Sequence, residues 1–557
     1  MLIPKIKDNN YIIISVLGII IFSLFLGQVN LFDWDEINFA ESAREMLLTG
    51  DFLTVQINFE PFWEKPPLFI WMQALSMWIF GVNEFAARFP NAICGVVTLL
   101  VLYRMGKEMK NKSFGIIWVV SYACSFLPFF YFKSGIIDPW FNLFIFLGIY
   151  HAAKYTDKDY TGRRTRRAIL SGLYIGLGTL TKGPVAILIF ALVGTILLII
   201  RKFAIKFKIK DILFFIGVLT FTGGFWFILQ ILTGNYHVMA DFIEYQIRLF
   251  KTQDAGHGGF LLYHFVVVFL GVFPSSIFAL SGLRRPKSIT DYEKHIRQVM
   301  IILLFTVLVL FTIVKTKILH YSSLAYFPVT YLATWSIYEI VNKKHKIKWW
   351  TNVLIILVAL IFAIPMFVIS VFDKIKPWLL VKGRIDDLFA VANLQADVNW
   401  TGLEFIIGLI LLIGVLYYLL KIKRNIKHGL LSIAMSSFLY INFTLIFVIT
   451  KVEGYTQRAA IDFYKSMQNT DVYVETLGFK SYAHYFYTLK PKNKNLESNN
   501  KDWLINGHVD KDVYFVSKND RVENYLNKYP NLKVIGEKNG FVFITRKDVL
   551  KTDYDKE

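Results

Sequence analysis

The chain has 557 residues, of which 55% are hydrophobic and only 18% are charged. A soluble domain carries about a quarter charged residues, so this composition excludes an ordinary soluble protein. The formal net charge is +20, but the basic residues are concentrated in short loops between apolar runs, so we expect no nucleic-acid partner. The two cysteines, Cys94 and Cys124, both lie inside apolar runs, which excludes a disulfide framework.

Apolar runs of about 20 residues recur along the chain, and each is long enough to cross a bilayer core of about 30 Å. They predict an α-helical polytopic membrane protein with about 13 transmembrane helices. The first run is too long for the core of a cleaved signal peptide, so we expect it to be retained. The predicted spans are residues 11–29, 85–105, 113–131, 136–153, 168–181, 183–201, 210–232, 261–282, 298–314, 319–339, 349–372, 402–421 and 428–450.

The charge of the connecting loops predicts the orientation of these spans. Alternate loops, beginning with the amino terminus, hold most of the Lys and Arg residues that lie between spans. By the positive-inside rule, that side of the membrane is cytoplasmic. An odd number of spans then places the carboxyl terminus on the external face, together with loops 30–84 and 233–260.

Residues 451–557 differ in character from the rest of the chain. They are more polar and contain alternating segments such as "DVYVETL" and "DVYFVS", and the "KNG" of "LKVIGEKNGFVFITRK" predicts a tight turn between two strands. Segments near 457–468 and 519–529 have a helical pattern. We therefore predict two units, a transmembrane domain of residues 1–450 and a small external α/β domain of residues 451–557.

Acidic residues crowd the stretch "FDWDEINFAESAREM", residues 32–46, directly after the first apolar run. Three of them, Asp33, Asp35 and Glu36, fall within four positions. Asp33 followed three residues later by Glu36 fits a helix capping box. Capping needs only one or two acids, which leaves one for chemistry, such as a general base that removes a proton from an acceptor hydroxyl or amine.

The stretch "FWEKPPLFIW", residues 62–71, forms a second charged cluster on the same predicted external loop. Glu64 and Lys65 precede two prolines, which favour a rigid turn or a first helical turn. A surface ion pair at a turn is the simplest interpretation. The four aromatic residues around the pair favour the membrane interface instead, where an acid and a base suit a charged headgroup.

Two further ionisable residues lie at the external ends of predicted spans. Asp138, in "SGIIDPWFNLFIF", begins the fourth span, where it acts either as a helix N-cap or as a functional acid, because charge inside a membrane segment is costly. Lys182, in "TKGP", also lies at a helix end. A lysine there usually snorkels toward the headgroups, so we assign it no catalytic role.

An external transferase needs a donor that crosses the membrane already activated. Nucleotide sugars are cytoplasmic, so the DxD motif of nucleotide-sugar enzymes does not explain "DWD" on this loop. A sugar linked to polyprenyl phosphate satisfies the requirement. Its phosphate leaves during transfer, so cations must lie beside it, and the external candidates are Lys65, His257, Lys315 and Lys317. The carboxylates could also hold a divalent cation, and we expect no organic cofactor.

"DEINFAESAREMLLTGDF" followed by "FWEKPPLFIW" resembles the first external loop of the aminoarabinose lipid A transferases and of bacterial relatives of the protein mannosyltransferases. The resemblance implies an inverting transferase of the membrane C-type (GT-C) fold in the bacterial inner membrane. It implies a polyprenyl phosphate donor that carries a pentose or hexose. It also implies that membrane lipids surround the protein. By position it implies that Asp35 activates the acceptor, with Glu36 beside it and Asp138 as a second functional acid. Glu64 then contacts a metal or a headgroup, and Lys65 and His257 belong to the donor site.

The chain departs from this family at Gly258, Gly259 and Phe260, where the lipid A enzymes carry a basic residue that holds phosphate. Either Lys315 or Lys317 supplies that charge, or donor binding differs. The acceptor stays open among lipid A, another envelope glycan and secreted protein hydroxyls. The alternative function is a transporter or lipid flippase, since charges at the membrane also mark ion pathways. The chain shows no pair of related halves, which argues against that alternative.

Overall fold

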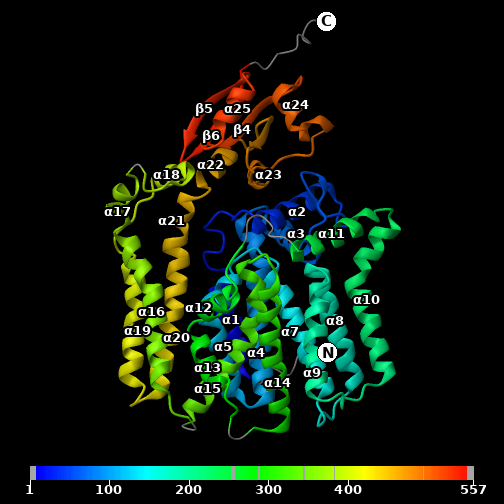
Figure 1. The fold of residues 1–557 in the computed structure, drawn as a ribbon. Coiled ribbons are helices and arrows are strands. Elements are labelled where there is room, and N and C mark those ends of the chain that lie inside the picture. Colours follow the sequence, from blue (N-terminus) through cyan, green and yellow to red (C-terminus); the bar gives the residue numbers. More distant parts are fainter. Residues whose placement is uncertain are drawn as a thin grey trace.

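The computed structural model describes residues 8–251, 258–286, 289–342, 345–381, 383–493 and 495–547. Long helices lie side by side in a bundle, and a small sheet with short helices covers one end of them (Figure 1). The first helices are α1 (Asn9–Ser23), α2 (Asp35–Thr49), α3 (Leu68–Phe80), α4 (Glu84–Met109), α5 (Lys112–Ala123), α6 (Phe126–Tyr131), α7 (Asp138–Thr156), α8 (Arg164–Lys182), α9 (Val185–Ile200) and α10 (Ile209–Leu232). A two-stranded hairpin, β1 (Gln56–Ile57) and β2 (Glu60–Pro61), lies between α2 and α3.

The remaining elements of the helical body follow α10 in chain order. Its elements are α11 (His237–Lys251), α12 (Tyr263–Gly271), α13 (Ser275–Gly282), α14 (Asp291–Ile313), η2 (Leu319–Ala325), α15 (Tyr326–Val341), α16 (Trp349–Ser370), α17 (Phe372–Leu379), α18 (Leu388–Leu394), α19 (Phe405–Lys421), α20 (Ile426–Phe443), η3 (Thr444–Ile449), α21 (Thr450–Val452) and η4 (Glu453–Tyr455). The elements α20, η3, α21 and η4 form one continuous helical segment, Ile426–Tyr455. The domain boundary predicted after residue 450 falls inside this segment and remains a prediction.

Among the described residues, five helices are long and apolar enough to cross a membrane: α4, α10, α14, α16 and the segment Ile426–Tyr455. Helices α12 and α13 are bent by 110° at a short break and make a sixth if they count as one span. Each of the 13 predicted ranges overlaps a helix, but 13 crossings remain a prediction. Large apolar side chains such as Leu213 and Phe221 on α10 are exposed, which suits a lipid environment and not water.

Small residues allow the helices near the site to approach closely. Gly176 of α8 lies against α10, where an added Cβ would collide with Thr222 Oγ1 and lie 3.0 Å from the backbone nitrogen of Gly223. Helices in membranes gain van der Waals contact through such small-residue interfaces. This close contact fixes α8 against α10. Because α8 ends at Lys182, the contact also fixes where the Lys182 side chain begins.

The C-terminal region contains one four-stranded sheet in the order β3-β4-β6-β5. Strands β3 and β4 are parallel, while β6 runs antiparallel to both of its neighbours. The predicted "KNG" turn between β5 and β6 is confirmed, with Asn539 and Gly540 both at positive φ. The elements are α22 (Arg458–Ser466), β3 (Val472–Leu477), α23 (Ala483–Thr488), η5 (Leu496–Asn499), α24 (Lys501–Asn506), β4 (Asp512–Lys518), α25 (Val522–Lys528), β5 (Leu532–Lys538) and β6 (Phe541–Arg546).

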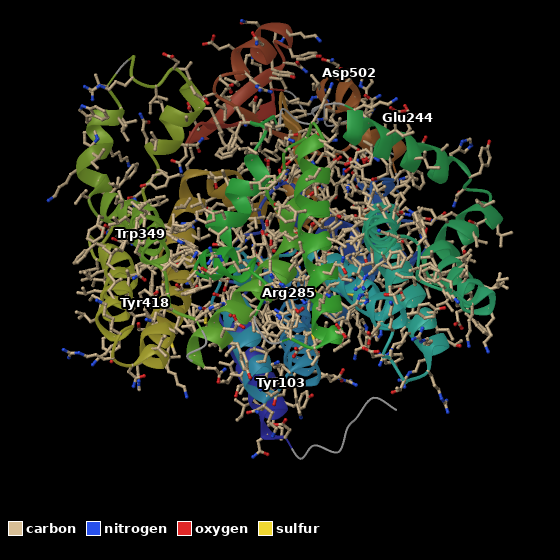
Figure 2. All side chains as sticks on the ribbon, turned by 60° about the horizontal axis from the view of Figure 1, so that its bottom comes forward. Tyr103, Glu244, Arg285, Trp349, Tyr418 and Asp502 are labelled. Carbon is tan, nitrogen blue, oxygen red and sulfur yellow. The ribbon has the colours of Figure 1, made fainter. Side chains whose placement is uncertain are left out.

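The C-terminal region rests on the segment between α1 and α4. Ile37 and Met46 of α2 share one buried apolar cluster with Ile461 of α22 and Phe486 of α23. Figure 2 shows Glu244 of α11 and Asp502 of α24 toward one end of the molecule and Tyr103 of α4 toward the other. The segments predicted to be external are thus gathered at a single end.

Candidate active site

The acidic stretch forms the start of α2, but no carboxylate caps this helix. The N-cap residue is Trp34, and no side chain makes a capping hydrogen bond. Asp33 instead accepts a hydrogen bond from the hydroxyl of Ser481 in the C-terminal region. The capping box predicted for Asp33 and Glu36 is therefore wrong, because both side chains have tertiary partners.

Glu36 is buried in an ion pair with Arg88 of α4. Arg88 donates from Nη2 to Oε2 at 2.7 Å and from Nε to Oε1 at 2.9 Å, and the backbone amides of Phe32 and Gly135 donate to the same two oxygens. Burial opposes ionisation, but Arg88 outweighs it and holds the pKa of the Glu36 carboxyl below its usual value. A carboxylate has about four acceptor positions, and all are used. The structure therefore favours a positioning role for Glu36 over the catalytic role predicted from the sequence.

A cavity of about 450 Å³ lies beside the start of α2 and brings most of the predicted site residues together. Three helices, α2, α7 and α9, begin at residues that line it. Because the amino-terminal end of a helix carries a partial positive charge, this arrangement favours an anion. The ionisable and hydroxyl-bearing residues in its wall are Asp33, Asp35, Glu36, Glu64, Lys65, Asp138, Lys182, Tyr245, His320 and Tyr321.

Asp35 and Asp138 face one imidazole. Nε2 of His320 lies 3.6 Å from Asp35 Oδ2 and 3.8 Å from Asp138 Oδ2. Lys182 Nζ makes an ion pair of 2.7 Å with Asp138 Oδ1. The Asp138 side chain is 3% exposed and that of Asp35 is 33% exposed. Asp138 is thus buried and compensated by a lysine, whereas Asp35 is the carboxylate that an incoming molecule can reach.

Lys65 also lines the cavity, in contact with Tyr245 of α11. Its ammonium is 4.0 Å from Glu64 Oε2 and donates to the hydroxyl of Tyr245 at 3.4 Å. That hydroxyl in turn donates to Glu64 Oε2 at 3.0 Å. Burial lowers the pKa of Lys65, and the neighbouring Glu64 and Asp35 carboxylates oppose that effect. The predicted pairing of Glu64 with Lys65 is present, and it faces the cavity.

The other predicted phosphate-binding residues do not line this cavity. The ammonium of Lys317 donates to three backbone carbonyls at the end of α14, at 2.6–3.0 Å, which uses all three of its protons. Lys317 does not line the cavity, and its role in holding the donor phosphate stays a prediction. Lys315 is exposed and lies outside the cavity wall. His257 lies outside the described residues.

Lys182 and His320 are the site residues that sequence reasoning missed. Lys182 does not snorkel away; its side chain is 15% exposed and points to Asp138. The predicted topology did place Lys182 in a one-residue external loop and His320 just after the short external loop 315–318. These two external positions were the only sign in the sequence that Lys182 and His320 could belong to the site. The packing of α7, α8 and η2 is what brings their side chains to Asp138.

A divalent cation does not fit this cavity well. Within the described parts of the chain, no three His, Cys, Asp or Glu side chains are grouped as a metal site requires. Glu64, the predicted metal ligand, already accepts from Tyr245 and lies beside Lys65. Lys65 and Lys182 place positive charge where a metal would supply it, so we derive no step through a metal ion.

Part of the chain is similar in sequence to known transferases. Residues 64–226 match the family model described as dolichyl-phosphate-mannose-protein mannosyltransferase. The chain is 27% identical over 263 residues to the undecaprenyl phosphate-alpha-4-amino-4-deoxy-L-arabinose arabinosyl transferase of Photorhabdus laumondii, covering 47% of each protein. It is 26% identical over 298 residues to the protein of that name from Shewanella sediminis, covering 51% of this chain and 52% of the relative. The matched part thus spans about half the length of these curated relatives.

The likeness to solved structures extends over nearly the whole chain. The crystal structure of ArnT from Cupriavidus metallidurans bound to undecaprenyl phosphate has a TM-score of 0.75 at 16% identity, covering 97% of this chain and 98% of that one. Its apo form has a TM-score of 0.73 at 15% identity, with the same coverage. The predicted α-helical GT-C fold is confirmed by this likeness. The chain is thus similar in part of its sequence to the protein mannosyltransferase family model and to the aminoarabinose transferases, and nearly all of it shares the fold of ArnT.

Proposed function

We propose that this protein is an integral-membrane glycosyltransferase that moves a pentose or hexose from a polyprenyl phosphate donor to an acceptor of the bacterial envelope. The observation that carries the proposal is the cavity whose wall holds the accessible carboxylate of Asp35 together with Lys65, Lys182 and His320. The names of the curated relatives and the undecaprenyl phosphate in the ArnT structure support this donor class.

Asp35 is the general base of the proposed reaction. It takes the proton from an acceptor hydroxyl while the hydroxyl oxygen attacks C1 of the donor sugar. The bond between C1 and the phosphate oxygen breaks, and its electron pair leaves with the polyprenyl phosphate. Asp138 is less suited to this role, because it is 3% exposed and its charge is compensated by Lys182. Attack opposite to the leaving phosphate inverts the configuration at C1.

The leaving phosphate needs positive charge in place before the bond breaks. Lys65 and Lys182 supply two ammonium groups at the cavity wall, and His320 becomes a third cation when it is protonated. The amino-terminal ends of α2, α7 and α9 add partial positive charge in the same direction. Lys182 and His320 take the place that Lys317 had in the prediction from the sequence.

The proposal places the cavity and the C-terminal region on the external face of the bacterial inner membrane. The positive-inside rule supports this orientation, and so does the gathering of the predicted external segments at one end (Figure 1). Acceptors within reach are lipid A, another envelope glycan and secreted protein. The C-terminal region, which contacts Asp33 through Ser481, would then lie on the acceptor's side of the membrane.

The test compares sugar transfer by the purified wild-type protein and by Asp35→Asn, with a labelled polyprenyl phosphate sugar and a crude envelope extract. Loss of a general base costs about 10²–10⁴-fold in rate, so Asp35→Asn should lose nearly all product and still bind donor. Asp51→Asn is the matched control. Asp51 lies on the same loop, its carboxylate accepts from the amides of Leu53 and Thr54, and it does not line the cavity. This variant should transfer within a few-fold of wild type.

Two results would count against the proposal. Equal transfer by wild type and Asp35→Asn would remove Asp35 as the base. Movement of the labelled donor across proteoliposomes, with no transfer to any acceptor, would favour the transporter or flippase alternative.

A further inference from the structure

A cavity of about 260 Å³, which we call the α10 cavity, lies between α7, α8, α9 and α10. Figure 1 shows α8, α9 and α10 together at one edge of the helical body. Helix α8 reaches the candidate active site with its last residue, Lys182, whereas it lines the α10 cavity near its start, with Ala168 and Ser171. The two cavities therefore lie toward opposite ends of α8, and the loop charges predict that the α10 cavity is at the cytoplasmic end.

The wall of the α10 cavity contains a buried carboxylate. Asp211, in the first turn of α10, lines the cavity and is 2% exposed. Its Oδ2 accepts from the hydroxyl of Tyr155 at 3.2 Å, while its Oδ1 has no hydrogen-bond partner among the described residues. The helix dipole favours an acid in a first turn, which explains the charge but not its burial without a donor. A buried charged acceptor without a partner is costly, so a ligand that donates to Oδ1 gains affinity.

The rest of the wall is mostly aromatic and apolar. The Phe207 ring stacks on that of Tyr155 with centroids 5.8 Å apart, and the Phe190 ring stacks on that of Phe215 with centroids 5.2 Å apart. Phe215 lies about one turn farther along α10 than Asp211. Aromatic faces attract an alkylammonium group, and apolar surface favours hydrocarbon. The cavity is thus charged at the start of α10 and apolar farther along the helix.

The cavity reaches the outer surface of the helical body, where lysines adjoin it. Phe207 and Ile212 of its wall are 44% and 40% exposed. Lys208 and Lys210 are exposed and flank the start of α10, and the backbone amide of Lys208 donates to the Tyr155 hydroxyl at 3.2 Å. Lysine ammonium groups bind phosphate. The start of α10 therefore offers a carboxylate for a cation and, next to it in the chain, cations for a phosphate.

We propose that the α10 cavity binds a phospholipid of the cytoplasmic leaflet whose headgroup carries a primary ammonium. The ammonium donates to Asp211 Oδ1, the phosphate pairs with the lysines at the start of α10, and an acyl chain lies against Phe190 and Phe215. An anionic headgroup without an amine leaves Oδ1 without a donor, and a choline headgroup has no N–H to donate. This lipid site is independent of the proposed glycosyl transfer.

Native mass spectrometry of the full-length protein in detergent measures this selectivity. The protein is titrated with phosphatidylethanolamine, phosphatidylcholine and phosphatidylglycerol that carry the same acyl chains. Wild type should bind one phosphatidylethanolamine about tenfold more tightly than either other lipid, because a hydrogen bond between charged groups is among the strong ones. Asp211→Asn keeps an acceptor for Tyr155 but loses the charge, so it should lose that preference.

Two further variants separate binding from folding. Asp291→Asn is the matched control, because Asp291 is an exposed acid in the first turn of α14 on the same predicted side of the membrane. This variant should keep the preference of wild type. Phe207→Ala removes a partly exposed ring that precedes α10. It should weaken phosphatidylethanolamine binding several-fold and leave the thermal midpoint of the protein unchanged.

Four results would overturn the assignment. They are equal binding of the three lipids by wild type, an unchanged preference in Asp211→Asn, tighter binding of phosphatidylglycerol, and competition by glycerophosphoethanolamine as strong as that by the lipid. The third result would indicate an anionic-lipid site, and the fourth a site for a soluble amine. Asp35→Asn should bind the lipid as wild type does, so the outcome does not depend on whether the protein transfers sugar.

Discussion

Nζ of Lys182 lies 2.7 Å from Oδ1 of Asp138, where the end of α8 meets the start of α7. Both side chains are largely buried, so each charge depends on the other. Removing one partner of such a pair leaves an uncompensated charge and costs about 3–5 kcal/mol. The pair therefore stabilises the cavity wall and fixes the position of the Lys182 ammonium beside the proposed leaving phosphate.

We expect Lys182→Met and Asp138→Asn each to destabilise the protein by about 3–5 kcal/mol and to reduce transfer. The double variant should be more stable than the sum of the two losses predicts, because no unpaired charge remains. Thermal unfolding in detergent, combined as a double-mutant cycle, measures the coupling. Strictly additive losses would show that the two charges do not act as a pair.

Lys65 should control donor binding. Burial lowers the pKa of Lys65 from its usual value of 10.5, so its ammonium loses its proton at a lower pH than a free lysine. Donor affinity should then fall as the pH rises toward 10, since the phosphate binds the charged form. Lys65→Met should bind donor at least tenfold more weakly at pH 7.5, because an unpaired charge contact costs about 2–5 kcal/mol.

The same titration tests the location of the phosphate. Lys65→Met should show a flat pH profile between 7.5 and 10, measured with the polyprenyl phosphate donor. Lys315→Met provides the comparison, because Lys315 is exposed and lies outside the cavity wall. A larger loss in Lys315→Met than in Lys65→Met would place the phosphate elsewhere.

Glu36 should make stability depend on acid pH. Its carboxyl has a pKa below the usual 4.5 in the folded protein, because Arg88 outweighs the effect of burial. The unfolded chain therefore binds the proton more readily, and stability from this group is fully present above pH 4.5 and is lost as the pH falls through the folded pKa. Glu36→Gln should lose about 3–5 kcal/mol at pH 7. Its thermal midpoint should approach that of wild type at acid pH, and a constant difference from pH 7 to pH 3.5 would contradict this.

Glu45, on the same helix, should act in the opposite direction. Burial and the neighbouring Glu41 raise the pKa of Glu45 above its usual 4.5. The folded protein then keeps a proton that the unfolded chain releases, so stability falls as the pH rises above 4.5, by about 1.4 kcal/mol per pH unit until the folded group ionises. Glu45→Gln cannot ionise, so its stability relative to that of wild type should increase between pH 5 and pH 8.

Thermal midpoints of both proteins at pH 5, 6.5 and 8 measure this effect. Glu523→Gln, which removes an exposed carboxylate of α25, is the control and should follow wild type. Parallel profiles for wild type and Glu45→Gln would show that Glu45 is ionised in the folded protein at all three values.

Local patterns in the sequence were sufficient for the fold class and for part of the site. Apolar runs of membrane-spanning length predict helices because the bilayer requires every backbone group to bond within its own helix. Asp35, Lys65 and Asp138 were found for a related reason. Charge beside Trp and Pro at the end of an apolar run is costly there, so it indicates a role in chemistry or binding.

The partners of those residues were decided by the tertiary structure alone. Glu36 was predicted to be catalytic, but Arg88 and two backbone amides donate to all four acceptor positions of its carboxylate. Lys317 was predicted to bind the donor phosphate, but its ammonium donates hydrogen bonds to three backbone carbonyls at the end of α14. A local pattern shows which residue is charged, but its partners come from segments far away in the chain.

The cavity itself is the clearest example of that division. The sequence determined that Asp35, Asp138, Lys182 and His320 lie at the same predicted side of the membrane. Only the packing of α2, α7, α8 and η2 determined that His320 stands between the two carboxylates and that Lys182 compensates just one of them. Spans can be ordered by hydrophobicity and loop charge, whereas contacts between their ends depend on how closely the helices approach, as at Gly176 and Gly223, and no local pattern encodes that distance.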